Sequence, residues 1–190
     1  MTTGLIILIV IIALIVIIAL WAIGAYNNLV NIRNRVANAW AQIDVQLKQR
    51  ADLIPNLVNT VKGYAAHESE VFEEVTKARG AVQSAGSDNT LERMEAENQL
   101  SRAMVNVLAV SENYPELKAN QNFLDLQEQL KALESKIAYA RQFYNDVVLK
   151  MNNAIQQFPS NIVAGFGHFE LAKPFETAGN DREVPQVQFS

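Results

Sequence analysis

Few side chains in this sequence have the types and spacing that catalysis or metal binding requires. The chain has two histidines and no cysteine, which excludes thiol nucleophiles, redox pairs and cysteine-based zinc sites. His67 is followed by Glu68, like the start of a zinc-binding H-E-x-x-H helix, but position 71 is Val, so the second imidazole is missing. No Glu has a His three residues later, as di-iron sites in helix bundles need. The sequence therefore predicts no metal and no cofactor.

Two further patterns are too incomplete to bind a nucleotide or catalyse a reaction. Gly165 and Gly167 form a G-x-G, but no strand precedes it and no third glycine or phosphate-binding Lys follows. The acidic residues Glu73, Glu74, Glu92, Glu95 and Glu97 are typical of solvated helix faces. We therefore predict a protein that is not an enzyme and has no small-molecule substrate. An unfamiliar site on the Asn- and Glu-rich helix faces is the alternative.

The charges separate an apolar N-terminus from a polar body. Lys+Arg 16 against Asp+Glu 20 gives a net charge of −4, which offers no electrostatic reason to bind nucleic acid. The first charged residue is Arg33, and the 190 residues have room for one domain of ordinary size.

The apolar N-terminus has the length of a membrane span. After a flank of residues 1–4, the chain from Leu5 to Ile23 has no polar or charged side chain, and residues 5–25 form a helix of about 31 Å, which matches the ~30 Å hydrocarbon core. Trp21 and Tyr26 lie where interfacial aromatic residues anchor a span, or they simply pack. A cleaved signal peptide is the alternative, but no Lys or Arg precedes the run and no A-x-A site follows it.

The charges that flank the span predict its orientation. Arg33, Arg35, Lys48 and Arg50 outnumber a lone Asp44 after the span. Because Lys and Arg near a span tend to stay in the cytoplasm, we expect the N-terminus outside and the soluble domain in the cytoplasm.

Beyond the span, residues 26–158 have the periodicity of long amphipathic helices. Apolar residues at steps of three and four define a first stripe that keeps its phase through Pro55 and extends to Gly80, so we expect one continuous, kinked helix and a first hairpin turn at residues 84–89. A second helix begins near Asn89 or Thr90 and ends before Pro115. The third has five heptads from Phe123 to Phe158 and stops at Pro159.

These segments predict an all-α fold, in which the transmembrane helix continues into an antiparallel bundle of three to four long helices. The heptads are typical of coiled-coil packing and bury their seam within the chain or in a second subunit. Asn56 and Asn145 are among many Asn on these helices, and hydrogen bonds between helices or simple exposure would explain them. Residues 159–190 form an irregular, aromatic tail that folds back or meets a partner.

Taken together, the motifs resemble those of the LemA family. The residues that carry the resemblance include Trp40 and Asp44 in A-W-A-Q-I-D, Asp52, Pro55 and Asn56 in D-L-I-P-N-L, Tyr64, His67 and Glu68 in V-K-G-Y-A-x-H-E, Tyr114 and Pro115 in Y-P-E-L-K-A, Tyr144 with Asn145, and Phe158 with Pro159. The resemblance implies a protein of the bacterial inner membrane with one N-terminal span and an all-helical domain, and no reaction. We expect these residues to serve packing or assembly.

The leading hypothesis is a membrane-anchored, non-enzymatic scaffold whose partners are membrane lipid and further copies of itself. Confinement to a surface raises the effective concentration, so weak contacts between helices suffice to build assemblies. The alternative is a binding module that docks a cytoplasmic protein partner.

Overall fold

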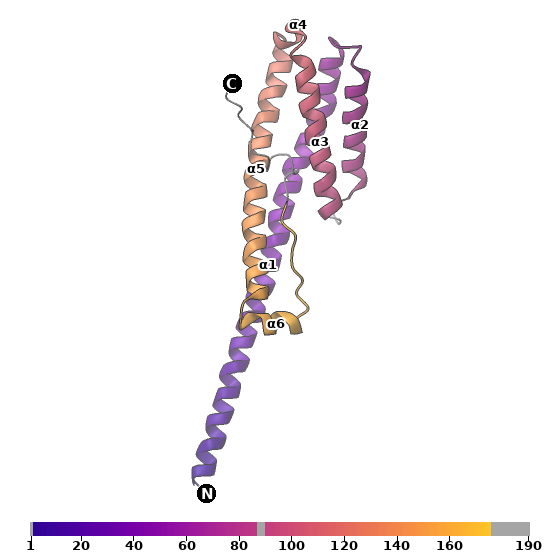
Figure 1. The fold of residues 1–190 in the computed structure, drawn as a ribbon. Coiled ribbons are helices and arrows are strands. Elements are labelled where there is room, and N and C mark those ends of the chain that lie inside the picture. Colours follow the sequence, from indigo (N-terminus) through magenta and orange to yellow (C-terminus); the bar gives the residue numbers. More distant parts are fainter. Residues whose placement is uncertain (1, 87–89, 176–190) are drawn as a thin grey trace, which may run out of the picture. The chain divides into compact units, whose positions relative to one another are not determined.

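A computed structural model describes residues 2–86 and 90–175, and this part of the chain contains helices and no strand (Figure 1). The helices are α1 (Thr2–Lys62), α2 (Ser69–Ser84), α3 (Thr90–Ser111), α4 (Pro115–Lys118), α5 (Gln121–Gln156) and α6 (Ser160–Phe166). The all-α prediction is confirmed.

Helix α1 continues through Pro55, as the stripe predicts. The neighbouring Ile54 and Leu57 are fully buried, and this burial offsets the backbone hydrogen bond that a proline removes. The predicted extension to Gly80 is wrong, because α1 ends at Lys62. Backbone N–H groups of Tyr64 and Ala65 then close the helix end on the carbonyl of Val61, at 3.0 and 2.9 Å.

The first turn therefore lies at residues 63–68, one helix earlier than predicted. The stripe continues through it because α2 buries Val75 and Ala78 in the same core as α1. The predicted caps Asn89 and Thr90 cannot be compared, since residue 89 and the Thr90 side chain lie outside the described part of the chain.

The chain divides into two compact units. The anchor unit comprises residues 1–40 and 143–174, and the bundle unit comprises residues 41–142 and 175–190. Helices α1 and α5 each contribute a stretch to both units.

The bundle unit is built around one apolar core, which α1, α2, α3, α4 and α5 all line. Its fully buried members include Ile54, Val61, Leu100, Val107 and Leu117. Helices α2 and α3 lie side by side (Figure 1). The short helix α4, which the sequence did not predict, contributes Leu117 to this core.

The heptad seam of α5 is buried within the chain from Phe123 to Met151. Phe158, at the end of the predicted seam, is 80% exposed. The helix also stops two residues early, at Gln156.

The anchor unit has a small core where Leu29 of α1 meets Ala164 of α6 and Phe169. A helix at this place corrects the expectation that Pro159 and the following glycines exclude one. Pro159 immediately precedes α6, where its missing N–H costs no hydrogen bond, and Gly167 follows the last turn. Phe169 and Phe175 are buried, so the described part of the tail folds back, while Phe189 lies outside the described residues.

Candidate functional site

The motif residues of two helix connections meet in the bundle unit. The amide of Asn120 donates a hydrogen bond to the Tyr64 hydroxyl at 2.9 Å, and its side-chain oxygen accepts from the backbone N–H of Phe123 at 3.1 Å. The Tyr114 hydroxyl donates to the Glu68 carboxylate at 3.3 Å. The turn after α1 is thereby tied to the turn before α5, so these polar groups hold the two connections together.

Tyr114 is the most perturbed acid of these connections. Partial burial raises the pKa of its hydroxyl, and the neighbouring Glu68 carboxylate raises it further by charge repulsion and as the acceptor of its hydrogen bond. The phenol therefore stays protonated at neutral pH and acts as a hydrogen-bond donor.

A charged network lies deeper in the same unit. The Arg50 guanidinium of α1 is fully buried and donates to Glu97 at 2.6 Å, to Glu134 at 2.7 Å and to the Ser101 hydroxyl at 2.8 Å. Glu97 is also fully buried, whereas the Glu134 side chain is 44% exposed. The network thus joins α1 to α3 and α5.

Arg93 extends this network toward α1 and α2. It contacts Glu97 at 3.0 Å, Asp44 of α1 at 3.3 Å and the backbone carbonyl of Val82 in α2 at 3.1 Å. Arg50 is therefore compensated by two carboxylates, and Glu97 by two guanidinium groups. The pair ties α1 to α3, because removing Arg50 or Glu97 leaves the other buried charge without its nearest partner.

Arg141 lies on α5, seven residues after Glu134. Burial lowers the pKa of its guanidinium, as does the charge of Arg50, while Glu134 and Glu97 oppose the shift. Its guanidinium carbon lies 4.2 Å from the centroid of the Phe175 ring, a cation–π contact that covers the cation with an apolar face.

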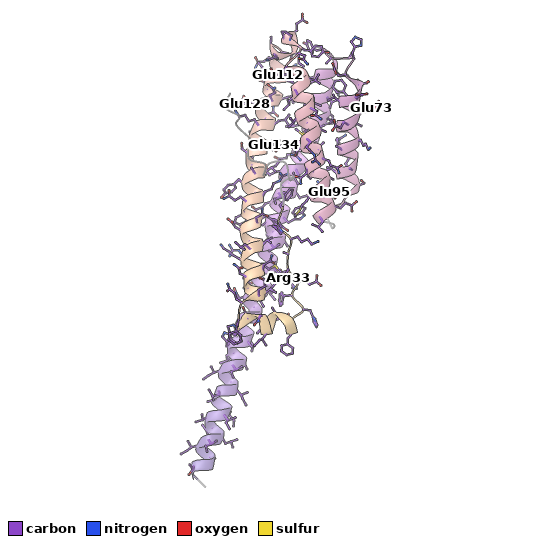
Figure 2. The ribbon with its side chains drawn as sticks, viewed as in Figure 1. Arg33, Glu73, Glu95, Glu112, Glu128 and Glu134 are labelled. Carbon is purple, nitrogen blue, oxygen red and sulfur yellow. The ribbon has the colours of Figure 1, made fainter. Side chains whose placement is uncertain are left out.

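Sequence reasoning missed this network. Arg50 counted as a flanking charge and Glu97 as part of a solvated face, and the second interpretation is wrong. The available signal was phase: Arg50 follows Ile43 and Leu47 at steps of four and three and precedes Ile54 by four, so it occupies a core position of the stripe. Glu73 and Glu95 are exposed as predicted (Figure 2).

The remaining predicted site residues do not join one centre. In the anchor unit, the rings of Trp40 and Tyr144 meet edge to face at 5.7 Å, and the Tyr144 hydroxyl donates to the Lys173 carbonyl. Burial raises the pKa of Tyr144. The other predicted positions differ in exposure. Six are exposed, namely Asp52, Asn56, His67, Pro115, Phe158 and Pro159, and two are half-buried, Pro55 and Asn145.

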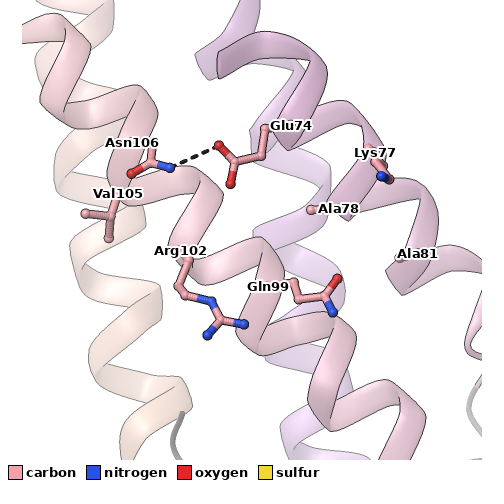
Figure 3. Close-up of a pocket in the computed structure, with 8 residues that line it drawn as sticks. All are labelled: Glu74, Lys77, Ala78, Ala81, Gln99, Arg102, Val105 and Asn106. Carbon is pink, nitrogen blue, oxygen red and sulfur yellow. Dashed lines mark hydrogen bonds between the residues drawn. The ribbon is translucent and has the colours of Figure 1, made fainter. Parts of the chain in front are cut away.

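Grooves line the surface of the bundle unit. One of about 650 Å³ lies between α2 and α3, where Asn106 donates to Glu74 at 3.0 Å beside Lys77 and Arg102 (Figure 3). Among the described residues, no group of three or more His, Asp or Glu side chains could hold a metal ion. The mixed charges of the groove between α2 and α3 fit a surface for polar contacts.

A larger groove of about 760 Å³ lies between α3 and α5 and is more apolar. Its rim includes Val105 and Leu124, which are 64% and 43% exposed. A third groove, of about 500 Å³, is lined by α1 and α5 and carries Val45 and Tyr139, which are 53% and 72% exposed.

Comparison with known proteins identifies the family of this chain. The model of the LemA family matches residues 39–189, which is most of the chain. The chain belongs to the LemA family. All the residues of the charged network and of the tied connections lie within the matched region, whereas the apolar start of α1 lies before it.

Curated relatives agree with the family. The chain is 25% identical over 142 residues to Protein LemA of Metamycoplasma hominis, covering 75% of this chain. It is 23% identical over 175 residues to the magnetosome proteins MamQ 1 and MamQ 2 of Paramagnetospirillum magneticum, covering 80% of this chain. It spans 64% of the length of each of these relatives.

In this LemA family chain, the start of α1 is a helix long and apolar enough to cross a membrane. None of its most apolar stretch is buried inside the protein. Leu5 and Ile23, the ends of the predicted span, are 59% and 58% exposed, and Trp21 and Tyr26 are 43% and 46% exposed. A soluble core helix would bury such residues, so this exposure indicates membrane anchoring.

Proposed function

We propose that the protein is a single-pass, non-enzymatic scaffold that self-associates at a bacterial inner membrane and organises lipid or membrane-bound partners. The observation that carries the proposal is the continuity of α1, which passes from exposed apolar residues into the core of the bundle unit without a break. The same helix therefore belongs both to the membrane anchor and to the core of the bundle unit, so every copy of the bundle unit is tethered to the membrane.

The polar motif residues support a structural role. Tyr64, Glu68, Tyr114 and Asn120 hydrogen bond to one another and tie the helix connections. Arg50 and Glu97 tie α1 to α3. These side chains are engaged in holding the domain together, as a scaffold requires.

Exposed apolar residues on the grooves support self-association. The α1–α5 groove carries Tyr139 and Val45, and copies anchored in one membrane are confined to the same surface. Confinement raises the effective concentration, so even a small apolar contact drives assembly. The similarity to two proteins named for the magnetosome is compatible with such a role.

The orientation that we propose places the bundle unit in the cytoplasm. Arg50 no longer counts toward it, because Glu97 and Glu134 neutralise its charge. The exposed Arg33, Arg35 and Lys48 still provide the positive flank.

The direct test is the mass and symmetry of the full chain extracted with its native lipid, by electron microscopy and mass photometry. We expect an ordered assembly larger than a dimer. Replacing Val45 and Tyr139 by Ser should dissociate it, whereas Leu91→Ser, at a 46% exposed residue of α3 outside the grooves, should leave it intact. A particle that is monomeric in lipid at every concentration would refute self-association.

A second candidate function is a membrane-tethered module that docks a cytoplasmic protein. The apolar α3–α5 groove favours it, because it is the size of a site for a side chain or a short helix. Leu124→Glu should then abolish cross-linking to one defined partner in cells while the mass of the purified particle stays unchanged. Loss of the assembly in the same variant would instead assign this groove to self-association.

A further inference from the structure

The anchor unit carries apolar side chains outside the span that none of its described residues covers. Ile162 and Phe166 of α6 are 51% and 85% exposed, and Phe158, which precedes α6, is 80% exposed. Within α6, the spacing of four residues places Ile162 and Phe166 on one side of the helix. Large apolar side chains gain free energy by leaving water, so an apolar environment would stabilise this face.

The opposite side of α6 is held firmly. Ala164 packs with Leu29 of α1 and with Phe169 in the small core, and Val163 packs against it. The Phe169 ring also meets Tyr26 edge to face at 5.6 Å. A Cβ added to Gly167 would lie 3.2 Å from the Tyr26 ring and closer still to Phe169, so only glycine permits this approach. The exposed face is therefore presented in a fixed direction.

The height of this contact on α1 matches the membrane interface. At 1.5 Å per residue, Tyr26 and Leu29 lie about 5 and 9 Å beyond Ile23, where the apolar run ends. The interfacial region on each side of a hydrocarbon core is roughly 5–8 Å deep. Helix α6 lies next to α1, and α1 continues past it toward the N-terminus (Figure 1).

A positive charge on α1 near α6 also suits a position of α6 at the membrane interface. Arg33 lies beside the segment that follows α6 (Figure 2), with its guanidinium carbon 5.3 Å from the centroid of the Phe169 ring. Arg33 is exposed and lies about 15 Å beyond Ile23 along α1, so its charge is on the aqueous side of the interface, where the negative surface potential of anionic lipid attracts it.

We propose that α6 lies in the interface of the membrane that α1 crosses, with Ile162 and Phe166 inserted at the boundary between headgroups and acyl chains. The protein then contacts lipid twice, through a spanning helix and through a short interfacial helix packed on it. The second contact fixes the depth of α1 and its rotation about its own axis, which a uniformly apolar span leaves undetermined.

The absence of native cysteine allows a direct test with the full chain. Single variants Phe166→Cys, Leu14→Cys and Asn38→Cys are labelled with a nitroxide and reconstituted in vesicles of phosphatidylethanolamine and phosphatidylglycerol. Accessibility to oxygen, which partitions into lipid, is compared with accessibility to a water-soluble nickel chelate. Leu14 is the lipid control within the span, and Asn38, an exposed residue of α1 about 22 Å beyond Ile23, is the water control.

We expect the ratio of oxygen to nickel accessibility at position 166 to exceed that at position 38 several-fold and to approach that at position 14. A ratio equal to that at position 38 would overturn the proposal. Protection from both reagents would also overturn it, since it would place a second copy or another protein on α6. The Leu14 control reports the span separately, so failure of α6 to insert is distinguishable from failure of the anchor.

Discussion

The two units of this chain differ in which side chains they bury and which they expose. The bundle unit buries two guanidinium–carboxylate partners, Arg50 and Glu97, in its interior. The anchor unit exposes its run of Ile, Leu and Val from Leu5 to Ile23 and buries apolar side chains beyond that run, among them Leu29, Val148 and Ala164. The first unit is organised around a buried charge network, whereas the exposed run of the second indicates a lipid surrounding.

The largest expected effect comes from removing one charge of the buried network. Arg50→Ala should destabilise the bundle unit by about 3–5 kcal/mol, because it leaves Glu97 buried without its main partner. Chemical denaturation of the full chain in detergent measures this loss. Glu95→Ala, at an exposed residue on the same helix, should change stability by less than about 0.5 kcal/mol. Equal effects of both variants would contradict a buried network.

The matching test in the anchor unit adds a charge where the chain is apolar. Leu14→Arg at the middle of the span should oppose insertion by about 2.5–3.5 kcal/mol. The fraction of protein that remains in carbonate-washed membranes should fall, while Leu14→Phe should not change it. Extraction of the wild-type protein by carbonate would mean that this helix is not in lipid.

A smaller effect is expected at the connections that bear the family motifs. Asn120→Ala removes the side chain that caps the start of α5 and donates to Tyr64, so we expect a loss of about 1 kcal/mol. Thermal unfolding followed by circular dichroism measures it. Asn113→Ala, at an exposed residue of the preceding connection between α3 and α4, serves as the control and should unfold at the wild-type temperature.

The raised pKa of Tyr114 predicts a dependence on alkaline pH. Because the folded pKa exceeds the ordinary value of 10.0, the stabilisation is complete below pH 10.0 and is lost as the pH rises through the folded pKa. Denaturation midpoints across this range should therefore fall more steeply in wild type than in Tyr114→Phe. Parallel curves would show that neither burial nor the Glu68 carboxylate raises the pKa of Tyr114 in the folded protein.

The smallest effect is expected at Asn56, which the sequence suggested as a link between helices. Its side chain is exposed, so Asn56→Ala should change the free energy of unfolding by less than about 0.5 kcal/mol. A larger loss in a denaturant titration of the reconstituted protein would point to a contact with another molecule at this face.

The spacing of apolar residues predicted those helices whose regularly spaced apolar side chains are buried in the core. The second and third predicted helices correspond to α3 and α5, because Leu100, Val107, Phe123 and Ile137 fall at regular core positions. The end of α1 was missed, since α2 keeps the same phase and the pattern alone does not reveal a turn. Arg50 and Glu97 were missed because residue type was weighed above phase, and only their pairing across 47 positions explains their burial.

The discontinuous anchor unit imposes an order on synthesis. Its first stretch, residues 1–40, leaves the ribosome before the bundle unit, and its second, residues 143–174, only afterwards. At about 5–20 residues per second, the 102 residues of 41–142 take roughly 5–20 s to translate. During that delay Leu29 lacks Ala164 and Phe169, so this side of α1 stays uncovered until the second stretch of the anchor unit has been made.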